Sequence, residues 1–219
     1  MRRIYVHVWA KAIVWGLGIR VRVRGAKPDS GQPRLFLVSN HYGPLDVLVL
    51  GSAWPMTFVS RHDVAGWPGV NLLVRVGGTL YANRKARQTS LALVRTAARR
   101  LRQGGHIHVL AEGVSTDGRR LLPFISTLFE APVRSGTVIQ PVTIRYRSIN
   151  GRPITRRNRD RICWYQNMGF IPHVMNVMRN WGIEVEVVFS RPLKPEGSRK
   201  ELAIEARRRV AEHWRPPWA

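Results

Sequence analysis

Cysteine is almost absent from this sequence, because Cys163 is the only one in 219 residues. An intrachain disulfide is therefore excluded, and the composition is typical of a reducing compartment. Since Cys163 lies between Ile162 and Trp164, we expect a buried structural thiol rather than a catalytic nucleophile. The sequence also lacks a G-x-S-x-G pattern, which disfavours a serine hydrolase with a nucleophile elbow.

Acidic residues are scarce as well. The 13 Asp and Glu are outnumbered by 36 Lys and Arg, so that the net charge is +23 and the pI is about 11.8. A charge of this size attracts polyanions such as nucleic acid, an anionic membrane surface or a phosphorylated substrate. We find no helix-turn-helix, zinc-finger or RNP pattern and therefore expect no nucleic acid partner. A basic nucleic-acid-binding protein and a noncatalytic membrane-surface protein stay open as alternatives of another class.

A long hydrophobic run is missing too. The most apolar segment, Ile4 to Ile19, is short for a bilayer span and is interrupted by His7 and Lys11. No small-residue cleavage site follows it, so we do not expect a signal peptide. Its tryptophans and basic flanks are typical of a helix that inserts into the cytoplasmic face of the inner membrane, although packing on the protein's own core is the alternative. We predict a membrane-associated helix over residues 1–24 and one domain over residues 25–219.

Strands alternate with helices through the rest of the chain. The apolar runs predict strands at Leu35–Ser39, Met56–Ser60, Thr79–Ala82, His106–Leu110, Val138–Tyr146 and Ile183–Phe189. The intervening segments predict helices at Leu45–Ala53, Pro68–Val76, Thr89–Arg102, Pro172–Trp181 and Arg199–Trp214. This order indicates an α/β fold with a mostly parallel mixed sheet that is flanked by helices. The basic segment from Gly151 to Arg161 has no apolar rhythm, and we expect a surface loop there.

A histidine and an aspartate follow the first of these strands. His41 lies on the loop after Leu35–Ser39, and Asp46 lies in the first turn of the next helix, just beyond Gly43 and Pro44. If the loop folds back, the carboxylate accepts a hydrogen bond from the imidazole, fixes its tautomer and raises its basicity. His41 can then take a proton from a hydroxyl group. The H-x4-D spacing alone is a weak signal, and the scarcity of acidic residues around it strengthens the prediction.

Two later segments also place polar residues at strand ends, where ligands bind in open α/β sheets. Arg84 follows the strand at 79–82 and can clamp a phosphate, although a solvated arginine is the simpler interpretation of this segment alone. Glu112 and Gly113 follow the strand at 106–110. There, Glu112 can hold a substrate hydroxyl or position a basic side chain, and Gly113 lets backbone N–H groups approach a ligand closely.

A metal site is an alternative function for the strand at 106–110. His106 and His108 share one of its faces with Glu112, and such a geometry can ligate a metal. Without a clear open set of ligands around them, we predict no metal at this strand.

Together these segments resemble the glycerophospholipid (1-acyl-sn-glycerol-3-phosphate) acyltransferase family. Four blocks agree with the family's motifs in order and spacing over roughly residues 35–146, and a weaker likeness continues from Trp164 to about residue 193. The blocks are Asn40-His41 through Asp46 for N-H-x4-D, Phe58 to Arg61 with Gly66 to Pro68 and Gly78 to Arg84 for the second motif, Ala111 to Gly118 for P-E-G-T, and Gln140 to Ile144 for the P-V motif.

The sequence departs from the family's pattern at four positions. The family has proline, threonine, aspartate and lysine where this chain has Ala111, Val114, Asn83 and Arg61. The loss of the threonine hydroxyl at Val114 bears on contacts with the acceptor and implies an altered substrate preference. None of the four departures affects the histidine–aspartate pair.

The resemblance implies an O-acyltransferase. It would move a fatty acyl group from acyl-CoA or acyl-carrier protein to the free hydroxyl of 1-acyl-sn-glycerol 3-phosphate, giving phosphatidate, with no cofactor besides the acyl donor. The expected partners are a lysophospholipid acceptor, the acyl donor and an anionic membrane surface. His41 would be the general base and Asp46 would stabilise the imidazolium, while backbone amides near Gly43 or Gly113 are candidate oxyanion donors. The expected substrate-binding residues are Asn40, Arg61, Arg84, Glu112, Gly113 and Val114.

A second acceptor is implied by a narrower likeness. The stretches Thr116 to Gly118, Leu122 to Phe124 and Trp164 to Met168 resemble those of bacterial members of the family that acylate lyso-ornithine lipid. That acceptor has no phosphate, so Arg84 would bind a carboxylate instead. Acylation of lyso-ornithine lipid is therefore the alternative to acylation of lysophosphatidate.

Overall fold

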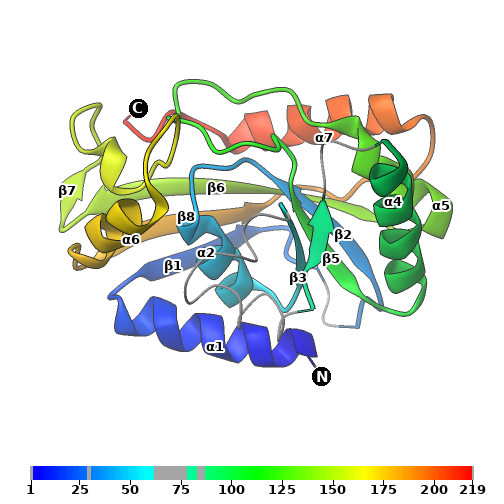
Figure 1. The fold of residues 1–219 in the computed structure, drawn as a ribbon, viewed down its shortest axis with the longest axis horizontal. Helices are drawn as coiled ribbons and strands as arrows, with labels where there is room; N and C mark the ends of the chain where they lie inside the picture. The colour runs from blue at the N-terminus through cyan, green and yellow to red at the C-terminus, as the bar shows by residue number, and fades with distance from the viewer. Residues whose placement is uncertain (1, 29–30, 62–77, 83–86, 219) are drawn as a thin grey trace.

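A mixed β-sheet runs through the centre of the computed structural model, which describes residues 2–28, 31–61, 78–82 and 87–218 (Figure 1). Its strands are β1 (Arg20–Gly25), β2 (Leu35–Ser39), β3 (Thr57–Arg61), β4 (Leu80–Ala82), β5 (His106–Leu110), β6 (Ile139–Ile149), β7 (Arg152–Pro153) and β8 (Ile183–Phe189). They follow the order β1-β8-β6-β2-β5-β3-β4, and β7 pairs with β6 outside this path. Neighbours along the path are parallel except for β6 and β8, which confirms the predicted mostly parallel mixed sheet.

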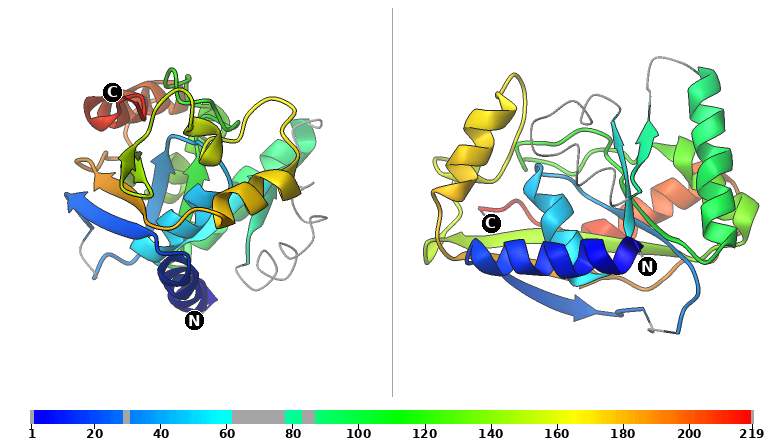
Figure 2. Two further views of the ribbon diagram at one scale, coloured as in Figure 1. Left: turned by 90° about the vertical axis from the view of Figure 1, so that its left-hand side faces the viewer. Right: turned by 60° about the horizontal axis from the view of Figure 1, so that its bottom comes forward.

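Helices cover both faces of this sheet (Figure 2). The first face carries α1 (Arg2–Gly16), α2 (Leu45–Ala53) and α6 (Phe170–Met178), and the second carries α4 (Arg87–Arg102), α5 (Glu130–Ser135) and α7 (Arg199–His213). Strand β2 belongs to both cores, because Leu35 and Leu37 pack on the first face while Phe36 and Val38 pack on the second. Burial on both faces explains why its sequence is a continuous apolar run.

The predicted elements agree closely with the observed ones. Strands β2, β5 and β8 and helix α2 have the predicted bounds, and the other predicted elements within the described residues differ by one to three residues at their ends. The predicted helix at Pro68–Val76 lies outside the described residues.

Strand β1 is an element that the sequence did not predict. It is the edge of the sheet and runs parallel to β8, and most of its residues are exposed. Its basic residues alternate with valines and pair with β8, where Arg20 lies 3.5 Å from Glu184 and Arg24 lies 3.5 Å from Glu186. We assigned these arginines to the flank of a membrane helix, so the predicted boundary at residue 24 falls inside this strand.

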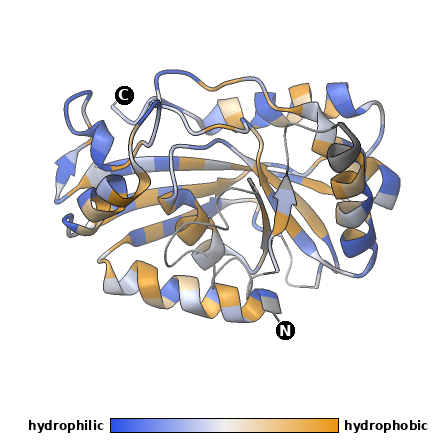
Figure 3. Ribbon diagram, viewed as in Figure 1, coloured by the Kyte–Doolittle hydropathy of each residue, from blue (hydrophilic) through white to orange (hydrophobic). Residues whose placement is uncertain are grey.

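Helix α1 packs on α2 and contains several hydrophobic residues (Figure 3). Some of their side chains are exposed to solvent. On its packed side Ala10 is 1% exposed and meets Gly51 of α2, and the His7 ring lies 2.7 Å from the Gly51 carbonyl oxygen. On its outer side Tyr5 is 65% and Trp15 is 85% exposed. None of the helices in the described part of the chain has the length and hydropathy that crossing a bilayer requires. Membrane association of α1 stays a prediction.

The close approach of α1 and α2 generates a stability prediction. A leucine at Ala10 would have no room beside Gly51, so Ala10→Leu should lower the free energy of unfolding by about 1–3 kcal/mol. The matched control is Ala12→Leu on the exposed side of the same helix, which should change it by less than about 0.5 kcal/mol. Urea denaturation of both variants measures the difference, and equal stabilities would contradict the observed packing.

Candidate active site

The candidate site lies where the loops after β2 and β5 meet at the carboxyl edge of the parallel strands. These strands are neighbours, with Ser39 of β2 opposite Leu110 of β5, so the residues that follow them come together. The first loop carries His41 and leads into α2 at Pro44, and the second carries Glu112. The predicted pairing of His41 with Asp46 is present, because the loop folds back as expected.

The Asp46 carboxylate is completely buried and is surrounded by hydrogen-bond donors. Its Oδ2 accepts the backbone N–H groups of Tyr42 at 2.6 Å and Gly43 at 3.0 Å, and it lies 2.8 Å from His41 Nδ1. Its Oδ1 accepts the hydroxyl of Tyr146 from β6 at 2.8 Å. A carboxylate placed in this way requires the ring proton on Nδ1, which leaves the His41 Nε2 lone pair available as a base.

Glu112 holds the backbone of His41 rather than its ring. Its Oε1 accepts the His41 N–H at 2.7 Å, and its Oε2 accepts the Leu122 N–H at 2.8 Å. The side chain is 5% exposed, and burial raises the pKa of this carboxyl to about 7, although the two N–H groups act in the opposite direction. Both oxygens thus accept hydrogen bonds within the protein. A contact of Glu112 with a substrate hydroxyl stays a prediction.

Asn40 also supports the loop that carries His41, from inside the protein. Its side chain is fully buried, and it forms a pair of hydrogen bonds with Ile144 of β6, donating to the carbonyl oxygen at 3.1 Å and accepting the N–H at 2.8 Å. These bonds tie the end of β2 to the neighbouring strand. The geometry places Asn40 in support of the loop that carries His41, and its contact with substrate stays a prediction.

The loop after β5 turns over His41. Gly113 has a φ of 72°, a left-handed conformation that glycine adopts readily, and this turn brings Thr116 back to the His41 carbonyl oxygen. That oxygen accepts the Thr116 N–H at 3.1 Å and the Thr116 hydroxyl at 3.3 Å. Val114, at the bend, is 43% exposed. His41 is therefore held through its ring, its N–H and its carbonyl.

Two predicted oxyanion donors are unsuitable in this geometry. The Gly43 N–H donates to Asp46 Oδ2, and the Gly113 N–H donates to the Leu110 carbonyl oxygen at 2.9 Å. Both groups are consumed by internal hydrogen bonds because each closes a tight turn. Within the described residues, the N–H groups of Val114 and Ser115 form no such bond.

The two predicted anion-binding arginines cannot be placed at the site. Arg61 is the last residue of β3, at the same edge of the sheet, and Arg84 lies outside the described residues. Their contact with a phosphate or carboxylate stays a prediction.

Histidines of β5 occupy the core beneath the site. His108 Nε2 lies 2.9 Å from Ser39 Oγ and its ring stacks on Phe58, while the His106 ring packs edge-on against Trp54. Burial lowers the pKa of His108 to about 3, so its ring is neutral. The described residues contain no group of three or more His, Cys, Asp or Glu side chains that could hold a metal ion.

The sequence did not indicate the contacts that Tyr146 and Arg159 make in the folded chain. Tyr146 lies 100 positions after Asp46 in an apolar strand, and nothing in the sequence around it indicates that its hydroxyl donates to Asp46.

Arg159 lies in the segment that we expected to be a surface loop, yet it is 8% exposed. Its guanidinium lies over the rings of Tyr165 and Trp218, with each ring centre 5.3 Å away, and 3.4 Å from Asp117. The expectation of a surface loop was therefore wrong at Arg159.

Cys163 is buried, as predicted. Burial also raises the pKa of its thiol, so that the nucleophilic thiolate is disfavoured. A structural role fits both observations.

The raised pKa of Glu112 predicts a pH dependence of stability. The folded state binds the proton more tightly than the unfolded chain, so this contribution is fully present below pH 4.5 and is lost as the pH rises through about 7. Between these values the wild type should lose roughly 1–3 kcal/mol of unfolding free energy relative to Glu112→Gln, which cannot titrate. Urea denaturation of both proteins across this range measures the difference, and parallel curves would contradict the assignment.

The sequence of this chain is similar to those of known acyltransferases. Residues 20–145 match the family model described as "Acyltransferase". The chain is 34% identical over 211 residues to "Lyso-ornithine lipid O-acyltransferase" of Rhizobium meliloti (strain 1021), which covers 92% of this chain and 72% of the relative. It is 26% identical over 131 residues to "1-acyl-sn-glycerol-3-phosphate acyltransferase" of Neisseria gonorrhoeae, which covers 59% of this chain and 51% of the relative.

A solved structure has a similar fold. It is the 1-acyl-sn-glycerophosphate (LPA) acyltransferase PlsC from Thermotoga maritima, with a TM-score of 0.66, 20% identity and coverage of 96% of this chain and 78% of that chain. The fold is therefore PlsC-like, and the match to the family model extends over more than half of the chain. With the order of the four sequence blocks and the paired His41 and Asp46, these findings mean that the chain belongs to the acyltransferase family.

Proposed function

We propose that this protein transfers a fatty acyl group to the hydroxyl of a lysolipid, and that the acceptor is lyso-ornithine lipid. The observation that carries the chemistry is the His41–Asp46 pair, in which Nδ1 faces the carboxylate and Nε2 is left for the substrate. The His41 side chain is 16% exposed, so a hydroxyl can reach it while most bulk water is kept away. The acyl donor is a thioester, carried by CoA or by acyl-carrier protein.

In the proposed reaction His41 Nε2 takes the proton from the acceptor hydroxyl as its oxygen attacks the thioester carbonyl carbon. The Asp46 carboxylate stabilises the imidazolium that forms. When the C–S bond breaks, the thiolate leaves and takes the proton back from His41, so that an ester and a free thiol are the products. The N–H groups of Val114 and Ser115 replace Gly43 and Gly113 as candidate donors to the oxyanion.

Support for the lyso-ornithine acceptor comes from two directions. The similarity to the lyso-ornithine relative covers 92% of the chain, compared with 59% for the relative that acts on 1-acyl-sn-glycerol 3-phosphate. The segments that carried the narrower likeness also surround His41: Thr116 binds its carbonyl, Leu122 binds Glu112, and Trp164 donates to the carbonyl of Tyr42. These observations favour lyso-ornithine lipid over lysophosphatidate, the acceptor that the family resemblance first indicated.

Removal of the base tests the chemistry. His41→Ala should lower turnover by roughly 10²–10⁴-fold, because the acceptor hydroxyl then loses its general base. The control is His213→Ala in the last turn of α7, which should keep wild-type turnover. The turnover of both variants is measured in an acyl-transfer assay at saturating substrate. Near-normal turnover by His41→Ala would rule out the assignment of His41 as the general base.

Competition between acceptors tests the substrate. Purified protein with acyl-CoA or acylated carrier protein should convert lyso-ornithine lipid to its O-acylated product with a kcat/KM at least about tenfold above that for lysophosphatidate. Mass spectrometry of the extracted lipids measures both products from one mixture. A preference for lysophosphatidate would overturn the acceptor while leaving O-acyl transfer in place.

A further inference from the structure

The outward side of α6 is an apolar surface that nothing in the described structure covers. His173 and Val177 point into the protein, whereas Ile171, Met175 and Met178 are each about half exposed. Trp181, just beyond the helix, is 77% exposed. We call Ile171, Met175, Met178 and Trp181 the α6 face. Clustered exposed apolar side chains of this kind mark surfaces that contact other molecules.

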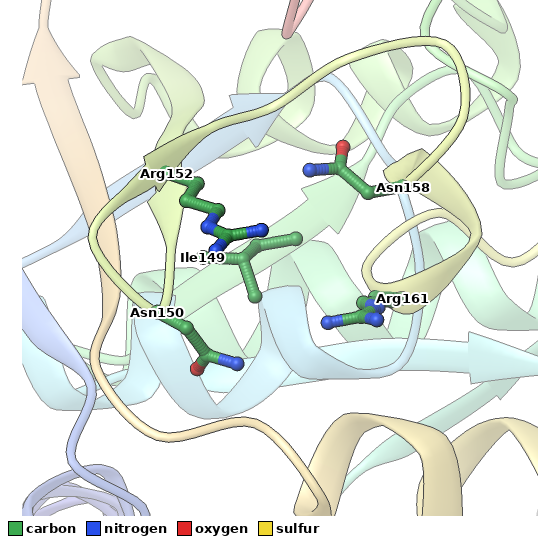
Figure 4. Close-up of a pocket in the computed structure, with 5 residues that line it drawn as sticks. All are labelled: Ile149, Asn150, Arg152, Asn158 and Arg161. Carbon is green, nitrogen blue, oxygen red and sulfur yellow. The ribbon is translucent and has the colours of Figure 1, made fainter.

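A basic pocket lies directly beside the α6 face (Figure 4). It has a volume of about 360 Å³ and is lined by Ile149, Asn150, Arg152, Asn158 and Arg161. The side chains of Arg152 and Arg161 lie on opposite sides of Ile149. Asn150 joins the two features, because its Oδ1 accepts the backbone N–H of Trp181 at 2.7 Å. We call this the arginine pocket.

The charge around the arginine pocket is strongly positive. Arg152, Arg156, Arg157 and Arg161 are all exposed in this segment. Its one acidic residue, Asp160, is engaged: it accepts the Tyr165 hydroxyl at 2.7 Å and lies 3.6 Å from Arg159. Several guanidinium groups are thus left to attract an anion, and arginine suits the planar oxygens of a phosphate.

The α6 face is also close to the catalytic loop. Trp164 donates its backbone N–H to the Tyr42 carbonyl oxygen at 2.7 Å and its indole N–H to the Met168 carbonyl oxygen at 2.8 Å, immediately before α6 begins. At the other end, a Cβ on Gly18, just after α1, would lie 3.2 Å from the Gly182 nitrogen beside Trp181. A surface that contacts the α6 face would therefore also lie near His41 and the exposed aromatic side of α1.

We propose that the α6 face inserts into a bilayer surface while the arginine pocket binds the phosphate of an anionic phospholipid headgroup. Apolar side chains that enter the interface and cations that neutralise lipid phosphates together give a two-part attachment. The proposal rests on the proposed function only in that a lipid acceptor has to be reached from a membrane. It adds a headgroup site that is separate from the site where the acceptor reacts.

Depth of insertion tests the apolar half of the proposal. Cys163 is buried, so a bimane probe can be attached selectively to a Met178→Cys variant. The matched control is Ile204→Cys, an exposed apolar position on α7, across the sheet. On vesicles of phosphatidylcholine and phosphatidylglycerol that carry a nitroxide lipid, the probe at 178 should be quenched several-fold more than the probe at 204. Equal quenching at the two positions would overturn insertion of the α6 face.

Charge reversal tests the arginine pocket. Arg152→Glu/Arg161→Glu should weaken binding to vesicles that contain phosphatidylglycerol by at least about tenfold. Lys194→Glu/Lys200→Glu changes the net charge equally in the connection that leads into α7 and in its first turn, and should have a much smaller effect. The start of α7 lies on the opposite side of the molecule from α6 and β7 (Figure 1). Because Arg161 also donates to Asn180, Arg152→Glu alone is the second variant, and it should show part of the loss. Equal losses from the pocket and control variants would overturn a headgroup site.

Activity in detergent micelles separates this proposal from the proposed function. Vesicle binding is not needed there, so the pocket variants should acylate a micellar lysolipid at the wild-type rate. A wild-type protein that binds vesicles as described but acylates no lysolipid would overturn the function and leave the docking surface. If micellar activity is normal but the pocket and control variants bind vesicles equally well, the docking surface is overturned and the proposed function stands.

Discussion

Burial of the Asp46 carboxylate is the constraint on which the rest of the site depends. A carboxylate removed from water needs donors at both oxygens, and Asp46 receives them from Tyr42, Gly43, Tyr146 and the His41 ring. Three of these partners lie within five residues of Asp46. The loop therefore has to fold back on the helix to bring their hydrogen-bond donors to the carboxylate. The same hydrogen bonds that make burial tolerable also orient the imidazole of His41.

The second carboxylate acts on the backbone of the same loop. Glu112 takes the His41 N–H, and Thr116 closes the loop through the His41 carbonyl oxygen. The position of His41 is thus determined by hydrogen bonds from the loop after β5 as well as from Asp46 of α2, which is the kind of support that precise proton transfer needs. In a chain with only 13 acidic residues, two are used in this way, and several others pair with surface arginines.

The sequence predicted the features that depend on neighbours along the chain. The His41–Asp46 pair spans five residues, and β2 is a continuous apolar run, so both could be recognised locally. The contact of Tyr146 with Asp46 joins residues 100 positions apart, and only the pairing of β6 with β2 brings them together. The exposed, arginine-rich β1 was missed because the pairing of its charges with glutamates of β8 is a tertiary feature.

The tautomer of His41 is the property that tests the account most directly. Nitrogen-15 NMR of the imidazole distinguishes a protonated ring nitrogen from an unprotonated one, and comparison with a His41→Gln variant identifies the signals among the seven histidines. The buried Asp46 carboxylate predicts that the neutral ring carries its proton on Nδ1 and leaves Nε2 free. A neutral ring with its proton on Nε2 would contradict the proposed base and the role of Asp46.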